Sequence, residues 1–340
     1  MKSTRNTHVA ILRGGISSED YLSRRSAAVV EEALRSNGYR VEVLDWVADG
    51  TIRLSKTGDG RDMTSWPSLV HCFADYRPDV VFNTLHGELE NAGQVQGFFE
   101  LAGIPLTGNG ITPSVIGMDK VLTKDVFDIL SVIHPRDVQL GFPRYDDAMR
   151  SVARLRNSGL GYPFMLKLTH GGSSSGLDLI EDEDSFVSTW ERWGLDVEDP
   201  GVMAFAEEYI DGPEYCVGTF GHWRLPDITI LPVAEIEFEG RYFDKNIKFE
   251  DRYRVNCGHE LAAQHQFHMR RVAIDVHRHL RFVGFSRIDF RIRDDRIYAL
   301  EVNTHPGLGP SSIIPNSLEC SDLTMQEAVS LLVEWSISPP

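Results

Sequence analysis

The most informative stretch of the sequence is Phe285-Ser-Arg-Ile-Asp-Phe-Arg-Ile-Arg-Asp-Asp-Arg-Ile-Tyr-Ala-Leu-Glu-Val-Asn303. It indicates both a local fold and a possible chemical site. Polar and apolar residues alternate on both sides of a short polar segment, a pattern that predicts a β-hairpin. We take residues 294–296 as a three-residue loop, which fixes the register of the two strands. The expected cross-strand pairs are Arg287 with Asn303, Ile288 with Val302, Asp289 with Glu301 and Phe290 with Leu300.

The polar members of these pairs share one face of the hairpin, because side chains alternate between faces along a strand. Asp289 and Glu301 would then lie opposite each other, with Cβ atoms about 4.5 to 5.5 Å apart. Two carboxylates at that distance need a counter-ion, and together with the Asn303 amide they suit Mg²⁺ bridging to phosphate oxygens. Arg287 is suited to stabilising a transferred phosphoryl group. A solvated hairpin with loosely paired charges explains the same pattern.

Two further segments have features of nucleotide sites. Small residues at 170–176 follow an expected strand at 164–168 that carries Lys167, and such a loop can wrap phosphates with its backbone N–H groups. It lacks a Walker A sequence, so a flexible linker is the alternative. Residues 206–214 read as a connector strand, a turn at 211–213 and a second strand from Glu214.

The first third of the chain alternates strands and helices. Strands are expected at 9–12, 41–44 and 79–85, and helices at 23–37 and 94–102. This order is typical of a Rossmann-like parallel sheet. Later helices are expected at 120–130, 265–280 and 324–336, with a larger antiparallel sheet from Phe205 onward. We expect an α/β protein with three domains, at 1–114, 115–204 and 205–340.

Composition limits the classes of partner. Acidic residues number 50 and basic residues 34, so the net charge of −16 argues against nucleic acid or an anionic membrane surface as partner. The four cysteines show neither a metal-binding nor a disulfide-framework spacing. The first eight residues are polar and the first apolar run is short, so we expect an unprocessed cytoplasmic protein without a membrane segment.

Lysine is scarce in this chain. Only seven of the 34 basic residues are lysines, namely Lys2, Lys56, Lys120, Lys124, Lys167, Lys245 and Lys248. Genomic base composition explains an excess of arginine. The remaining lysines are nevertheless candidates for positions that require a compact ammonium group.

Taken in order, these segments resemble the D-alanine–D-alanine ligase family of ATP-grasp enzymes over nearly the whole chain. The matching motifs are Gly14-Gly15-Ile16-Ser17-Ser18-Glu19 with Leu22-Ser23, Leu85-His86-Gly87, Gln96-Gly97, Gly103-Ile104-Pro105-Leu106-Thr107-Gly108, Met118-Asp119-Lys120, Gly172-Ser173-Ser174, Arg287-Ile288-Asp289, Glu301-Val302-Asn303-Thr304 and Pro306-Gly307. Lys167, Glu207, Glu214 and Lys248 complete the series. The resemblance implies an ATP-grasp fold behind a Rossmann-like domain.

The resemblance also implies a role for each site residue. ATP would be held by Lys120, Lys167, Gly172, Ser174 and Lys248 at its phosphates, by Glu207, Glu208 and Ile210 at adenine, and by Glu214 at ribose. Two Mg²⁺ ions, or Mn²⁺ in their place, would be bound by Asp289, Glu301 and Asn303. Arg287 and the Gly307 N–H would stabilise transition states, Glu19, Ser173 and His86 would orient the first amino acid, and Ser312 would bind the second substrate's carboxylate.

The implied reaction joins two D-alanines through a D-alanyl phosphate, for peptidoglycan precursor synthesis. The implied partners are these small molecules and, in a homodimer, a second copy of the chain. Some positions depart from the family pattern: Glu90-Asn91-Ala92-Gly93 replaces Gly-Glu-Asp-Gly, Leu168 replaces proline, and Lys245 and Phe249 replace tyrosines. A related ligase for another dipeptide or for D-alanyl-D-lactate therefore stays open, as does a nucleotide-binding regulator that lacks turnover.

Overall fold

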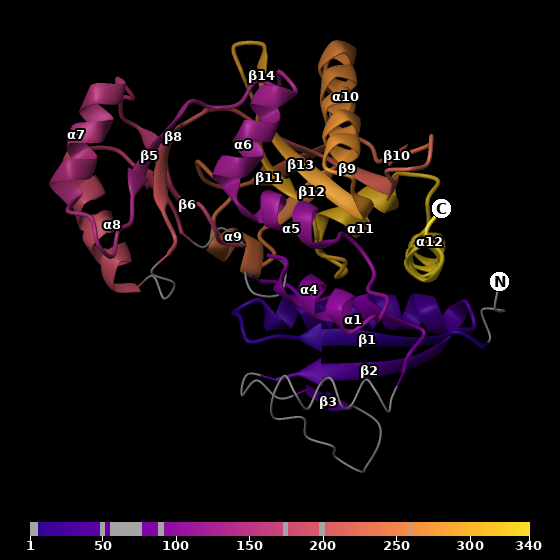
Figure 1. Cartoon of the computed structure of the whole chain (residues 1–340). Coiled ribbons are helices and arrows are strands. Elements are labelled where there is room, and N and C mark those ends of the chain that lie inside the picture. The colour runs from indigo at the N-terminus through magenta and orange to yellow at the C-terminus, as the bar shows by residue number, and fades with distance from the viewer. Residues whose placement is uncertain are drawn as a thin grey trace.

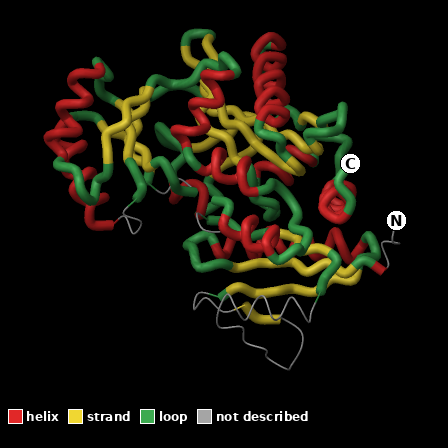
Figure 2. Tube along the Cα trace, viewed as in Figure 1, coloured by secondary structure: helices red, strands yellow, loops and turns green. Residues whose placement is uncertain are grey.

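Three sheets form the framework of the computed structural model, which describes residues 6–47, 52–54, 77–87, 92–172, 176–196, 201–258 and 260–340. The sheets lie in three separate parts of the molecule, as Figures 1 and 2 show. Each sheet is built from a different segment of the chain, so the functional residues come together only where the three parts meet.

The N-terminal sheet has the strand order β3-β2-β1-β4. Its strands are β1 (His8–Gly14), β2 (Arg40–Trp46), β3 (Ile52–Leu54) and β4 (Val80–Asn83), and its helices are α1 (Asp20–Ser36) and α4 (Gln94–Leu101). β1 pairs in parallel with β2 and β4, which confirms the parallel sheet predicted from the sequence. α1 begins three residues before the predicted start at Ser23, because the turn after β1 leads directly into it.

The second sheet is antiparallel, in the order β5-β8-β6-β7. Its strands are β5 (Asp137–Gly141), β6 (Phe164–Leu168), β7 (Leu177–Ile180) and β8 (Ala204–Glu208), with helices α7 (Ala148–Ser158) and α8 (Glu183–Asp196). Phe186 of α8 packs on Phe164 of β6, and Trp190 of the same helix packs on Phe186. The predicted strand at 164–168 is confirmed, and the division into domains at 114 and 204 remains a proposal.

The third sheet is the largest, in the order β12-β11-β9-β13-β14 with β10 beside β9. Its strands are β9 (Glu214–His222), β10 (Thr229–Ile230), β11 (Ala234–Phe238), β12 (Tyr253–Asn256), β13 (Val283–Arg293) and β14 (Arg296–Asn303). α10 (Ala263–His279) and α6 (Lys120–Ile129) pack on one face, and α5 (Ile111–Met118) leads into α6. The short helices α9 (Lys245–Phe249) and α11 (Ile313–Leu318) follow strands of this sheet.

The β13–β14 hairpin corrects one detail of the prediction. The turn has two residues, Asp294 and Asp295, both with positive φ, and not the three that were expected. A one-residue bulge at Leu300 then shifts the register, so Phe290 faces Ala299 and the expected pair with Leu300 is wrong. Beyond the bulge the three pairs nearest the site are as predicted: Arg287 with Asn303, Ile288 with Val302 and Asp289 with Glu301.

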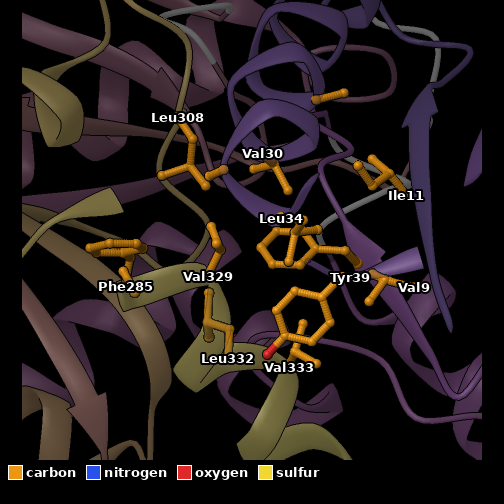
Figure 3. Close-up of a cluster of buried hydrophobic side chains, with 14 of the residues drawn as sticks. Val9, Ile11, Val30, Leu34, Tyr39, Phe285, Leu308, Val329, Leu332 and Val333 are labelled. Atoms are coloured by element: carbon orange, nitrogen blue, oxygen red, sulfur yellow. The ribbon is translucent and has the colours of Figure 1, made fainter. Parts of the chain in front are cut away.

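A hydrophobic cluster joins the two ends of the chain. Figure 3 shows its side chains from β1, α1 and α12 (Met325–Ile337): Val9, Ile11, Val30, Leu34, Val329, Leu332 and Val333. Asn37 after α1 also donates to the Gln326 carbonyl at 2.7 Å. This packing fixes the N-terminal sheet against the C-terminal part. No helix in the described ranges is long and apolar enough to cross a membrane.

A buried histidine in this framework predicts an acid-sensitive stability. His277 of α10 is 0% exposed, its Nδ1 lies 2.8 Å from Thr219 Oγ1, and burial lowers its pKa from 6.5 to about 4. The unfolded chain therefore binds a proton at higher pH than the folded chain, and stability present above pH 6.5 is lost as pH falls toward 4. We expect a loss on the order of 3 kcal/mol from this group.

Denaturant unfolding across this pH range checks the expectation. His277→Gln should flatten the dependence of unfolding free energy on pH, whereas His279→Gln, at an exposed position of the same helix, should leave it unchanged. Equal slopes in the two variants would contradict a neutral buried imidazole at 277.

Candidate active site

One pocket lies where the three sheets meet, and it gathers the predicted site residues from all of them. Its lining includes Glu19, Lys120, Lys167, Gly172, Glu207, Glu208, Ile210, Glu214, Lys248, Arg287, Asp289, Glu301, Asn303, Gly307 and Ser312. His86 also lines it. Ser173 and Ser174 lie outside the described residues. The structure therefore brings the remaining predicted residues together, and their individual roles remain proposals.

The polar face of the β13–β14 hairpin lines the pocket. Arg287 donates from Nε and Nη2 to the two oxygens of Asp289, at 2.6 and 2.7 Å. Burial raises the pKa of Asp289, and the adjacent guanidinium opposes that effect. Burial also disfavours the charged form of Glu301, but Lys120 and other cations outweigh it and hold the pKa of Glu301 below its usual value. The face thus presents two carboxylates to a pocket that also holds three lysines.

The same face has the donor chemistry of a magnesium site. Asp289 and Glu301 are paired across the strands, and Asn303 lies two residues further along β14 on the same side. These are hard oxygen donors, which Mg²⁺ prefers. Among the described residues no group of three His, Cys, Asp or Glu side chains could hold a metal. Phosphate oxygens and water would therefore have to complete the coordination of an ion bound here.

Several cations line the part of the pocket that faces the second sheet. Lys120 begins α6 and donates from Nζ to the Gly171 carbonyl at 2.9 Å. This bond holds the start of the segment 170–176, here called the glycine loop. Lys167 of β6 forms an ion pair with Glu207 of β8. Lys248 comes from α9, where burial lowers its pKa and the Glu19 carboxylate opposes that shift. Three segments therefore bring ammonium groups to one cavity, an arrangement suited to a polyphosphate.

Glu19 precedes α1 and points into the pocket. Glu19 is 8% exposed, and its Oε1 atom accepts no hydrogen bond within the described part of the chain. A Cβ at Gly172 would lie only 2.8 Å from that oxygen, so the glycine loop approaches the carboxylate as closely as a residue without a side chain allows. A buried acceptor of this kind needs a donor, and a substrate ammonium would supply one.

The segment between β8 and β9 is fixed by Arg291, which the sequence analysis did not single out. Its guanidinium donates to Glu214 Oε2 at 3.1 and 3.2 Å and to the Ile210 carbonyl at 2.9 Å. Burial raises the pKa of Glu214 to about 7, and Arg291 opposes the shift. The Glu208 side chain pairs with Arg293 instead, at 2.7 Å, so Glu208 is expected to meet a nucleotide through its backbone.

Arg291→Met should lower the free energy of unfolding by about 3 kcal/mol, because it leaves the Glu214 carboxylate buried without its partner. Denaturant unfolding measures this loss, and Arg296→Met at an exposed position of the same hairpin serves as the control. Adding Glu214→Gln to Arg291→Met should recover part of the loss. If the double variant were less stable than Arg291→Met, the ion pair would not be the cause.

A hydrogen-bond network borders the far end of the pocket, beside Gly307 and Ser312. Arg25 of α1 donates to Asp251 at 3.1 Å and to Ser311 Oγ at 2.7 Å, and Ser311 Oγ donates to Asp251 at 2.6 Å. The Tyr253 hydroxyl donates to the Ser311 carbonyl at 2.7 Å. These contacts join the N-terminal sheet, the segment after α9 and the loop that carries Ser312.

Two histidine rings also lie at this end. The rings of His86 and His305 have centroids 5.4 Å apart, and burial lowers the pKa of each to about 3. Both imidazoles are therefore neutral at physiological pH. Sequence reasoning named His86 but not His305, which lies two residues after Asn303 in a segment with no periodic pattern.

Lys124 was also left without a role, although the scarcity of lysine was a signal for it. It lies one helical turn after Lys120 in α6, and its side chain is buried. Arg291 could have been found in another way, because it is two residues after Asp289 on the same face of β13. In both cases the sequence marked the residue but not its partner.

Three of the departures from the family pattern have local explanations. Leu168 donates its backbone N–H to the Gly176 carbonyl at 2.9 Å, a bond that a proline there could not form. The Phe249 ring packs on Tyr21 at 5.3 Å, and the Lys245 ammonium lies over the same ring at 5.4 Å. Aromatic packing therefore holds α9 in place, although Phe249 lacks the hydroxyl of the tyrosine that the family pattern has at this position. Asn91 lies outside the described residues.

Comparison with known proteins agrees with this geometry. The family described as "D-ala D-ala ligase C-terminus" matches residues 141–334. The chain is 31% identical to the D-alanine–D-alanine ligase of Sphingopyxis alaskensis over 336 residues, which covers 97% of this chain and 98% of that one. This match includes the N-terminal part of the chain, which lies outside the region matched by the family model.

Solved structures agree in fold. The ligase of Bacillus anthracis complexed with ATP has a TM-score of 0.76 at 22% identity and covers 97% of each chain. The VanG D-Ala:D-Ser ligase of Enterococcus faecalis has a TM-score of 0.77 at 23% identity, covering 96% of this chain and 98% of that one. At these identities the likeness establishes the fold alone, and it confirms the α/β ATP-grasp architecture predicted from the sequence.

Proposed function

The chain belongs to the D-alanine–D-alanine ligase family, and we propose that it joins two D-alanine molecules with ATP, releasing ADP and phosphate. This reaction supplies a dipeptide for peptidoglycan precursors. The observation that carries the proposal is the polar face of the hairpin, where Arg287 and the facing pair Asp289 and Glu301 line a pocket that also holds three lysines.

Two Mg²⁺ ions, or Mn²⁺ in their place, are proposed to be held by Asp289, Glu301 and Asn303. Bound there, the ions would neutralise phosphate charge and orient the transferred group. The facing register of the two carboxylates supports this assignment, as does their position in a pocket with three lysines. Lys120, Lys167 and Lys248 are proposed to hold the phosphates of ATP, and the backbone near Ile210 and the Glu214 side chain to hold the nucleoside.

In the first step, a carboxylate oxygen of the donor D-alanine attacks the γ-phosphorus. An oxygen–phosphorus bond forms, the bond to the β–γ bridging oxygen breaks, and ADP leaves. Arg287 lies where it can stabilise charge on the transferred phosphoryl group. Glu19 is proposed to orient the donor through its ammonium, which the unsatisfied Oε1 atom supports.

In the second step, the ammonium of the acceptor loses a proton to water, and the resulting amine attacks the acyl carbon. A carbon–nitrogen bond forms, the bond to the phosphate oxygen breaks, and the leaving phosphate takes up the second proton that the nitrogen loses. The Gly307 N–H and Arg287 are proposed to stabilise the tetrahedral transition state, and Ser312 to bind the acceptor's carboxylate. The glycine loop and α9 must exclude water, because water would hydrolyse the acyl phosphate.

A related ligase with a different acceptor is the second candidate. It is supported by the departures at Lys245 and Phe249, which lie in α9, the helix that also carries the pocket residue Lys248. The neutral pair of His86 and His305 lies at the acceptor end of the pocket and is a candidate for deciding between acceptors. A silent regulator is disfavoured, because a protein that only binds ATP needs fewer groups than Arg287, the two facing carboxylates and three lysines together.

Phosphate release by the purified protein with ATP and Mg²⁺ tests these alternatives. The panel contains D- and L-amino acids and D-lactate, and mass spectrometry identifies each product. We expect release with D-alanine alone, accompanied by the D,D-dipeptide. Strong preference for another pair would replace the proposed substrates, and silence with every pair would favour the regulator.

We further propose that the enzyme is cytoplasmic, where ATP and amino acids are supplied, and that it forms a homodimer, as membership of the family suggests. Analytical ultracentrifugation should give about twice the mass of the 340-residue chain. A single species at the monomer mass would refute the dimer.

A further inference from the structure

A buried group of three charges lies beside the proposed nucleotide site. Glu207 of β8 is 2% exposed and contacts two ammonium groups. Lys124 Nζ from α6 lies 2.8 Å from its Oε2 atom, and Lys167 Nζ from β6 contacts its Oε1 atom. Burial disfavours the charged form of Glu207, but the two lysines outweigh it and lower the pKa of the carboxyl. One carboxylate thus has two counter-ions from different elements.

The two lysines differ in what else they can reach. Lys167 lines the pocket, whereas Lys124 is not among its lining residues and contacts the other oxygen of the Glu207 carboxylate. Lys124 donates to the Pro135 carbonyl at 2.9 Å and lies 3.4 Å from His134 Nδ1 and 3.8 Å from Asp137. Its position is therefore fixed by α6 and β5, while Lys167 borders the pocket proposed for phosphates.

The way in which Lys167 is shared between Glu207 and ATP should affect the affinity for ATP, an inference that rests on the proposed function. The Lys167 ammonium has three N–H donors but a single charge, so it cannot fully offset both the Glu207 carboxylate and a phosphate oxygen. If it turns to the phosphates, Glu207 keeps a counter-ion only through Lys124, since an uncompensated buried carboxylate is strongly unfavourable. Without Lys124, Glu207 would retain Lys167 and withhold it from ATP.

We propose that Lys124 is a positioning residue that neutralises Glu207 and thereby releases Lys167 to the phosphates of ATP. The sequence supports a specific need for lysine here, because this position keeps one of only seven lysines in a chain where 27 of 34 basic residues are arginine. A compact ammonium fits between a carboxylate and a backbone carbonyl, where a guanidinium would need more room.

Calorimetric binding of ATP and of adenosine to the whole protein tests the proposal without requiring turnover. Lys124→Met should weaken ATP binding about tenfold or more, because Lys167 stays with Glu207, and should change adenosine binding less than about threefold. Equal loss for both ligands would indicate general distortion and overturn the proposal, as would unchanged ATP binding. Failure of the wild-type protein to bind ATP would instead count against the proposed function itself.

Glu207→Gln provides the matched background, which also serves if Lys124→Met does not fold. The amide needs no counter-ion, so Lys167 is free in this variant with or without Lys124. We expect Glu207→Gln and the double variant Lys124→Met with Glu207→Gln to bind ATP within about threefold of each other. A tenfold or larger loss in the double variant would show that Lys124 acts on ATP by a route other than Glu207, and the proposal would be wrong.

Discussion

Glu301→Gln is expected to reduce turnover by about 10³-fold or more while leaving the fold intact, a loss of roughly 4 kcal/mol of transition-state stabilisation. Glu301 lies directly across from Asp289, so removing its charge takes away half of the carboxylate pair proposed to hold metal. The amide is nearly isosteric, and the Glu301 side chain accepts no structural hydrogen bond that the substitution would have to replace among those described. The loss should therefore appear in kcat and not in stability.

Steady-state phosphate release over a range of Mg²⁺ concentrations measures this effect. Glu235→Gln, on β11 of the same sheet but outside the pocket lining, is the matched control and should keep its rate. Thermal melts should agree for the wild type and both variants. Wild-type turnover in Glu301→Gln would remove the metal assignment, and with it the main support for phosphoryl transfer at this face.

The register of the hairpin was predictable near the site, although for a partly mistaken reason. A two-residue turn and a bulge at Leu300 replace the expected three-residue loop, and the two changes cancel by the time the strands reach Asp289. Hydrophobic alternation demands this outcome, because a slip of one residue would turn Ile288 and Val302 toward the pocket and the charged residues into the core. Burial therefore fixed the register more firmly than the turn did.

The ion pairs that support the site could not be predicted in the same way. Lys124 and Glu207 are 83 residues apart in sequence, and Arg291 and Glu214 are 77 apart. Periodicity indicates which face a residue occupies, but not which distant segment will pack there. The scarcity of lysine marked Lys124, and strand alternation held a signal for Arg291 that was not used. The partners of both residues became visible only when β8 and β9 were placed beside α6 and β13.

Arg287→Met is expected to lower kcat by about 10² to 10³-fold and to change the KM for ATP only a few-fold. The guanidinium is held against Asp289 by two hydrogen bonds of 2.6 and 2.7 Å, so it is already oriented before a substrate arrives. Burial opposes its charge, but Asp289 outweighs that effect and raises the pKa of Arg287. A fixed positive charge of this kind stabilises most strongly the state in which negative charge is redistributed, which is the transition state.

Single-turnover kinetics separates this role from simple nucleotide binding. Methionine keeps most of the side-chain length without the charge, and Arg287→Lys keeps the charge without the two-point contact to Asp289. If orientation matters as well as charge, Arg287→Lys should fall between the wild type and Arg287→Met in rate, with ATP affinity nearly constant across all three. The opposite pattern, weaker ATP binding at an unchanged chemical rate, would assign Arg287 to the ground state. In that case the hairpin face would bind the nucleotide but not activate it.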